Sequence, residues 1–135
     1  MTLVLDAGGL GALARQRARL QELRRRGLWP AQVPAVVLTE ALTGDHRRDF
    51  HTNRLLQACQ VREVDETQAR EAARLRSATN RAGTITAVDA VVAALAGART
   101  GTVVLTSDPL DLRALAEHTA SPISIVACSF GFPLT

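Results

Sequence analysis

The sequence lacks two residue types and has few of a third. It contains no Lys and no Tyr, and aromatic residues make up only 3% of its 135 residues. The absence of Lys excludes every mechanism that needs a catalytic lysine, and all 16 basic residues are Arg. Because aromatic side chains form the stacking platforms of many single-strand binders, that mode of nucleic-acid binding is nearly excluded too.

Cysteines and long apolar segments are also scarce. The only two cysteines are Cys59 and Cys128, and their apolar context and spacing predict buried free thiols in a reducing compartment, not a disulfide or metal ligands. Asp6 interrupts the apolar N-terminus, which argues against a signal peptide. The longest uncharged stretch, residues 119–135, contains two prolines and is too polar to span a bilayer. We therefore expect a cytoplasmic protein without a membrane segment.

The sequence does contain an alternation of short apolar runs and helical stretches. Apolar residues make up 47% of the chain, and the net charge of +3 fits an anionic partner without requiring one. Predicted strands lie at residues 2–5, 33–38, 60–64, 102–106 and 123–126. This alternation is typical of an α/β fold with a parallel sheet. At this length we expect one domain over residues 1–135.

Local signals predict several helix starts. Asp65, followed by Gln68 three residues later, predicts an N-terminal cap. The Ala-rich segment 86–98 predicts a helix, and Pro109 is placed to begin another. The last seven residues, 129–135, carry no pattern that favours a helix or a strand.

Four acidic residues fall at matching positions of the predicted elements. Asp6, Glu40 and Asp108 follow predicted strands, and Asp89 lies in the first turn of the helix before the fourth strand. In open parallel α/β sheets, ligands bind outside the carboxyl ends of the strands. The sequence therefore predicts that four carboxylates from remote parts of the chain meet at one edge of the sheet.

Such a cluster needs a counter-charge, because each carboxylate disfavours ionisation of its neighbours. Mg²⁺ and Mn²⁺ prefer oxygen ligands and are commonly held by a few carboxylates together with a substrate phosphate. The matching chemistry is phosphodiester hydrolysis, which needs neither a protein nucleophile nor a histidine. Each acid has an ordinary alternative as well: Asp6 and Asp108 could cap helices, and Glu40 could be solvated. Asp89, on an otherwise apolar helix, would be costly without a partner, which favours function.

Around these acids the chain resembles the PIN-domain family and, within it, the VapC-type toxins. Residues 4–7 (Val-Leu-Asp-Ala) are similar to the family's first-strand motif, and residues 38–40 (Leu-Thr-Glu) to its glutamate position. Residues 86–94 are similar to the helix with the third acid, and residues 103–108 to the strand-then-acid ending. Each motif is weak alone, but the four keep their order and spacing over nearly the whole chain.

The resemblance implies a three-layer α/β/α sandwich around a four- to five-stranded parallel sheet. It implies an endoribonuclease that depends on Mg²⁺ or Mn²⁺, has RNA as its substrate and is the toxin of a toxin–antitoxin pair. Such toxins usually form homodimers and bind a small VapB-like antitoxin whose C-terminal segment occupies the active-site groove. By position, the implied catalytic residues and metal ligands are Asp6, Glu40, Asp89 and Asp108.

Three positions leave the implied site open. Thr106 is implied to bring a hydroxyl near it, although a strand residue needs no further role. Asp111 follows Asp108 by three residues, would face the same way on a helix and is the alternative fourth acid; we favour Asp108 for its place at the strand end. Where the family often has a small hydroxyl or amide residue this chain has Gly8, which removes one possible hydrogen bond and leaves the role to water.

Some of the arginines are candidate RNA ligands, since Arg suits planar, bidentate binding of phosphate. Arg47, Arg48 and Arg54, near the predicted position of Glu40, are the candidates for RNA contacts. The triplet at residues 24–26 favours a solvated helix end, which also suits the helix dipole.

Other function classes fit less well. A phospho-acceptor domain of the receiver kind needs a lysine that this chain lacks. A phosphohydrolase with Asp6 as nucleophile would usually carry a second Asp two residues later, where this chain has Gly8. A catalytically inactive PIN fold that binds RNA or a protein keeps the same acids, and it is the open alternative to a nuclease.

Overall fold

Five short strands form one sheet in the computed structural model, which describes residues 1–128 of the chain. Their order across the sheet is β3-β2-β1-β4-β5, and every neighbouring pair is parallel. The strands are β1 Thr2–Leu5, β2 Gln32–Pro34, β3 Gln60–Arg62, β4 Thr102–Thr106 and β5 Ile123–Ala127. The predicted α/β class with a parallel sheet is confirmed.

The second strand is shorter than predicted. We expect a strand over residues 33–38, but β2 ends at Pro34 and the chain continues as the 3-10 turn η1 (Ala35–Val37) and the short helix α3 (Leu38–Ala41). Proline has no N–H to donate to a neighbouring strand, so the ladder stops there. The prediction of a strand beyond Pro34 is wrong, while the predicted turn of helix at Glu40 is confirmed as part of α3.

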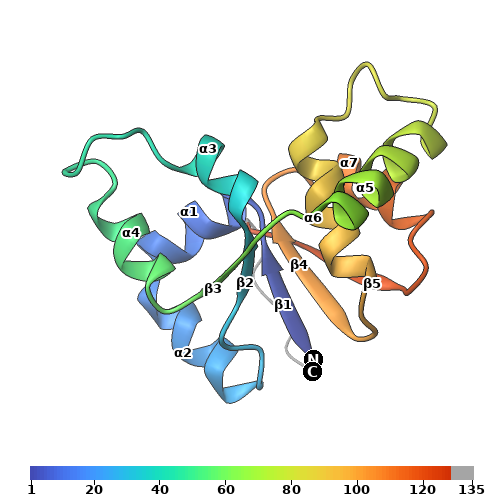
Figure 1. The fold of residues 1–135 in the computed structure, drawn as a ribbon. Coiled ribbons are helices and arrows are strands. Elements are labelled where there is room, and N and C mark those ends of the chain that lie inside the picture. Colours follow the sequence, from blue (N-terminus) through green and yellow to red (C-terminus); the bar gives the residue numbers. More distant parts are fainter. Residues whose placement is uncertain (129–135) are drawn as a thin grey trace.

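Helices cover both faces of the sheet, which confirms the three-layer arrangement (Figure 1). The helices α1 and α2, together with α4, lie on one face, and the helices α5 to α7 lie on the other. Their bounds are α1 Ala7–Arg15, α2 Arg17–Arg25, α4 Phe50–Leu56, α5 Glu66–Ala78, α6 Ala87–Gly97 and α7 Pro109–Ala116. In the sheet, which is the middle layer, β1 pairs with β4, a strand about a hundred residues further along the chain.

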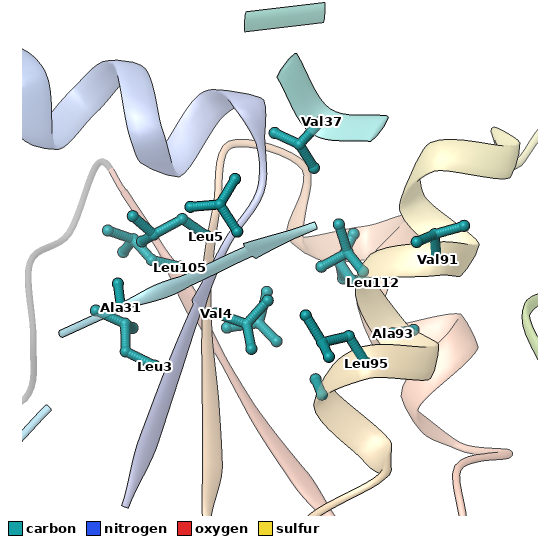
Figure 2. Packing of buried hydrophobic residues seen from close by; sticks show 14 of the residues in the cluster. Leu3, Val4, Leu5, Ala31, Val37, Val91, Ala93, Leu95, Leu105 and Leu112 are labelled. Atoms are coloured by element: carbon teal, nitrogen blue, oxygen red, sulfur yellow. The ribbon is translucent and has the colours of Figure 1, made fainter. Parts of the chain in front are cut away.

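The core lies on both sides of the central strands. Figure 2 shows Val4 of β1 on the side of the sheet that faces α6, and Leu3 and Leu5 on the opposite side, as expected for alternating strand residues. Residues 90–97 of α6 are all buried, because this helix lies across β1, β2 and β4. The packing holds the N-terminal turn of α6, and with it Asp89, in one place relative to the sheet.

Several local predictions hold within residues 1–128. The Asp65 carboxylate accepts a hydrogen bond from Gln68 N (2.8 Å) as the cap of α5, and Pro109 is the first residue of α7. Cys59 and Cys128 are both free, but they are half-buried and not fully buried as expected. In the described part of the chain, no helix has the length and apolarity needed to cross a membrane. The seven C-terminal residues, for which we predict no element, lie outside it.

Candidate metal and catalytic site

The central strands β1 and β4 end beside each other, and the segments that follow them lead to opposite edges of the sheet. After β1 the chain crosses α1 and α2 to β2 on one side, whereas after β4 it crosses α7 to β5 on the other. Such a topological switch point leaves a crevice outside the carboxyl ends of the strands. Because Leu5 pairs with Leu105, the residues that follow them, Asp6 and Thr106, meet at this crevice.

Asp6 is fixed at the crevice by two hydrogen bonds. One oxygen, Oδ1, accepts from Gly9 N (2.7 Å), so Asp6 caps α1; the other, Oδ2, accepts from the Thr106 hydroxyl. The same hydroxyl accepts from Asp108 N (2.8 Å). Thr106 is 0% exposed and therefore forms a buried bridge between the ends of β1 and β4. From the sequence, Asp6 could cap a helix or belong to the site. The structure shows that the two roles are compatible.

Two glycines let α1 begin against the end of β4. A Cβ at Gly9 would lie 2.2 Å from the carbonyl oxygen of Leu105, which leaves no room for a side chain. A Cβ at Gly8 would lie 1.9 Å from Ser107 Oγ. Ser107 therefore occupies the space that a side chain at position 8 would need.

Three carboxylates gather near Asp6. Oxygens of Asp89, Asp108 and Asp111 all lie within 4.8 Å of one another. Asp89 comes from the first turn of α6, whose start is capped by the Thr86 hydroxyl accepting from Asp89 N (3.1 Å). Asp108 and Asp111 come from the start of α7. Both candidates for the fourth acid, Asp108 and Asp111, therefore lie beside Asp89, and the structure excludes neither.

The electrostatics of these acids match a site whose negative charge the protein compensates only in part. Burial, and then the charges of Asp108, Asp6, Glu40 and Asp111, raise the pKa of Asp89 to about 7 from 3.8. Burial likewise raises the pKa of Asp6, although its hydrogen bonds with Thr106 and Gly9 work against the shift. The pKa of Asp108 is raised by burial and by its contact with Asp111. At neutral pH the protein carries carboxylates whose charge it disfavours.

The donor set fits a hard divalent cation. The converging atoms are carboxylate oxygens, with no thiolate or imidazole in the group of three, and such oxygens suit Mg²⁺ and Mn²⁺. Half-buried acids with raised pKa values gain from a cation that stabilises their ionised form. Asp89, Asp108 and Asp111 could therefore hold such an ion, with Asp6 beside them.

The remaining predicted residues lie further from this group. Glu40 is exposed on α3 and is outside the group of three, although its charge raises the pKa of both Asp6 and Asp89. Arg47 and Arg48 are exposed in the turn before α4, where Asp45 accepts from their backbone N–H groups. Arg54 lines a groove of about 390 Å³ with residues of α1, α2 and α4.

Sequence reasoning missed two residues next to the site and one buried acid elsewhere. Ser107 packs on Gly8, and Arg81 donates to Asp111 Oδ1 (2.9 Å) from the loop before α6. Ser107 is part of the strand-then-acid motif, so its position was a usable signal, whereas nothing near Arg81 in the sequence points to α7. Asp49 is the buried acid, and it accepts hydrogen bonds from Thr43 and Gly44 in the loop before α4.

Comparisons with known proteins agree with this fold. A family model described as the PIN domain matches residues 5–117. The chain belongs to the PIN-domain family. No curated protein matches it.

Solved structures share the fold at low sequence identity. DNA-bound VapBC from Salmonella typhimurium aligns with a TM-score of 0.69 and 18% identity, over 95% of this chain and 98% of that one. FitAcB from Neisseria gonorrhoeae aligns with a TM-score of 0.64 and 18% identity, over 95% and 99%. VapBC2 from Rickettsia felis, bound to a promoter DNA fragment, aligns with 0.68 and 13%, over 94% and 98%. These likenesses establish the fold of the whole described chain.

Proposed function

We propose that this protein is a metal-dependent endoribonuclease that hydrolyses RNA phosphodiester bonds and acts as the toxin of a toxin–antitoxin pair. The observation that carries the proposal is the convergence of Asp89, Asp108 and Asp111 beside Asp6 at the switch point. Membership of the PIN-domain family supports a nuclease, and similarity to the VapBC and FitAB toxin–antitoxin complexes supports the toxin role.

The metal ligands in this proposal are Asp6, Asp89 and Asp108, with Glu40 or Asp111 completing the set. When bound, Mg²⁺ or Mn²⁺ supplies an activated water and positive charge at the phosphodiester. Asp89, with its pKa near 7, gives up its proton on binding, so affinity should rise with pH up to neutrality. Thr106 orients the Asp6 carboxylate through a buried hydrogen bond, so the ligand does not have to be ordered during catalysis.

Partner binding forms part of the same proposal. Arg47 and Arg48, exposed in the turn before α4, and Arg54, exposed on α4, are the cations proposed to meet RNA phosphates. A VapB-like antitoxin would inhibit the enzyme by covering the crevice, and the toxin would act as a homodimer. Relief of growth arrest by a co-expressed antitoxin, and the mass of the purified toxin by light scattering, test these two statements.

The decisive test compares wild type with Asp89→Asn on total cellular RNA, with Mg²⁺, Mn²⁺ or a chelator. Wild type should release discrete fragments with 5′-phosphates only when metal is present. Loss of hydrogen bonds around a metal ligand costs roughly 10–100-fold in activity, so loss of the ligand itself should cost more. The matched control is Asp65→Asn, which makes the same change at the exposed cap of α5 and should retain full activity, because Asn also caps helices.

The outcomes separate the proposal from its rivals. Cleavage that persists in chelator or in Asp89→Asn would assign the activity to a contaminant or another site. A folded, partner-free wild type that cuts no RNA under any metal condition would favour an inactive PIN fold that only binds RNA or protein.

A further inference from the structure

We infer that Arg81 binds the phosphate backbone of the substrate at the acidic cluster, and that its pairing with Asp111 holds it there when no substrate is bound. This inference rests on the proposed nuclease function. Arg81 lies in the loop between α5 and α6, and its NH2 donates to Asp111 Oδ1 at 2.9 Å. Ion pairs such as Arg70–Glu66 and Arg74–Glu71 join neighbours on α5, whereas this one joins residues thirty positions apart.

The backbone of Arg81 is held firmly for a residue in an exposed loop. Its N–H donates to Thr79 Oγ1 (3.1 Å), and its carbonyl oxygen accepts from Thr84 N (2.9 Å), Ile85 N (3.0 Å) and the Thr84 hydroxyl (3.1 Å). Ile85 is fully buried, and its carbonyl accepts from Arg76 Nε at 2.6 Å. The loop is therefore anchored to the core, and the Arg81 side chain starts from a fixed point beside α7.

The guanidinium of Arg81 keeps donors for a ligand. Arginine offers five N–H donors in a planar fork, and one of them is used in the hydrogen bond to Asp111. The side chain is 48% exposed, against 19% for Asp111, so part of the guanidinium remains accessible to a ligand from solvent. A bidentate fork of this kind matches two oxygens of a phosphate.

A cation at the cluster favours the approach of a polyanionic substrate on electrostatic grounds. A polyanion that approaches Asp89, Asp108 and Asp111 is repelled by their negative charge. The positive charge of Arg81 acts on the same group, since it works to lower the pKa of Asp108. Arg81 therefore offers the approaching backbone an attractive contact at the edge of the site. Its ion pair with Asp111 is exposed and contributes little to stability, so the guanidinium can change partners at low cost.

The test measures binding of a fluorescent single-stranded RNA oligonucleotide over a range of KCl concentrations, with Ca²⁺ in place of Mg²⁺ to limit cleavage. Arg81→Gln should weaken binding about tenfold, the effect of a lost charge-assisted hydrogen bond. It should also reduce the slope of log affinity against log salt by about 0.7, the contribution of one phosphate contact on a single strand. Arg81→Lys, which keeps the charge but not the fork, should weaken binding while keeping the wild-type slope.

Two controls isolate the phosphate contact. Arg70→Gln removes the same charge from an exposed pair on α5 and should change neither the affinity nor the slope. Binding of Mn²⁺ alone, followed by electron paramagnetic resonance of the free ion, should be as tight in Arg81→Gln as in wild type, or tighter, because Asp111 loses a competing cation.

Two results would overturn the inference. The first is an unchanged salt slope in Arg81→Gln. The second is a parallel loss of Mn²⁺ and RNA affinity, which would mean that Arg81 only positions Asp111. Wild type that cuts RNA while Arg81→Gln binds it equally well would defeat this inference alone, whereas wild type that neither binds nor cuts RNA would defeat the proposed function.

Discussion

Two aspartates at the starts of different helices, Asp6 before α1 and Asp49 before α4, are equally buried but have opposite electrostatics. Asp6 and Asp49 are each 5% exposed, and each accepts hydrogen bonds from a threonine hydroxyl and from the backbone. Burial raises the pKa of Asp6. The N–H of Thr43, with further hydrogen bonds from that residue and from Gly44, holds the pKa of Asp49 below its usual range.

The difference lies in what surrounds the two carboxylates. Both oxygens of Asp49 accept from the turn at residues 43–44, and the charge of His46 also favours its ionised form. Asp6 instead faces the like charges of Asp108 and Glu40. A carboxylate that the protein itself satisfies needs no ligand, whereas one placed among other acids gains from a cation. Burial alone therefore does not distinguish an aspartate that the protein satisfies, such as Asp49, from one proposed to bind a metal, such as Asp6.

The largest effect should come from added metal. With Mg²⁺ or Mn²⁺ about a hundredfold above its dissociation constant, the unfolding free energy of wild type should rise by about 2.7 kcal/mol. Asp6→Asn should lose most of this increase, because it removes one of the proposed metal ligands. Asp49→Asn should start from a lower melting temperature but keep the full increase. Thermal melts with and without metal measure the starting stability and the metal-induced increase. An increase that is lost in Asp49→Asn but kept in Asp6→Asn would contradict the prediction.

Removal of the two threonine hydroxyls sharpens the comparison further. Thr106→Val deletes the bridge between Asp6 and Asp108 N, and cleavage should fall roughly 10–100-fold, as for other groups that orient metal ligands. Thr43→Val deletes the equivalent hydroxyl at Asp49 and should lower stability but not the activity of the folded enzyme. Initial rates at saturating metal, normalised to the folded fraction, provide the measurement. Equal losses of activity in both variants would contradict a special role for Thr106.

The smallest expected effect is a pH dependence of stability in the absence of metal. The pKa of Asp89 is 3.8 when unfolded and about 7 when folded, so the folded state binds more protons between these values. Stability should therefore fall as the pH rises from about 4 to about 7, by roughly 1 kcal/mol because the half-buried group is partly screened by solvent. Asp49 contributes with the opposite sign, since its stabilisation is present above the unfolded pKa and is lost as the pH falls through the lowered folded pKa.

Urea unfolding in chelator, repeated across this pH range, measures the effect. Asp89→Asn should flatten the decline toward neutral pH, and Asp49→Asn should remove part of the loss in acid. A decline that is identical in wild type and Asp89→Asn would show that another group carries it.

The strands and helix caps could be predicted because their signals are local. The β-branched run of β4, the cap at Asp65 and the proline that begins α7 each act within a few residues. The early end of β2 could not be read from its apolar run, since Val36 and Val37 suit a buried strand and a buried turn equally. Apolar character indicates that these residues are buried, but it does not specify their backbone conformation. Pro34 ends the strand, because proline has no N–H to donate to a neighbouring strand.

The site was predictable where it depends on strand ends and unpredictable where it depends on loops. Parallel strands bring Asp6 and Asp108 to one edge whatever the details of the fold. The nearness of Asp111 to Asp89 follows from the first turn of α7, which the sequence left as an alternative. Arg81 reaches the cluster through a loop whose path depends on the buried Ile85 and on hydrogen bonds that no residue pattern reveals.

The pairing of β1 with β4 has a consequence for synthesis of the protein. The crevice needs Asp6 from the start of the chain and the residues of β4 and α7, which a ribosome translates only after about a hundred others. Contacts of such long separation form late in folding. A chain whose synthesis has stopped before β4 and α7 therefore carries Asp6 without Asp108 and Asp111, so the acidic cluster cannot assemble until most of the described fold has been translated.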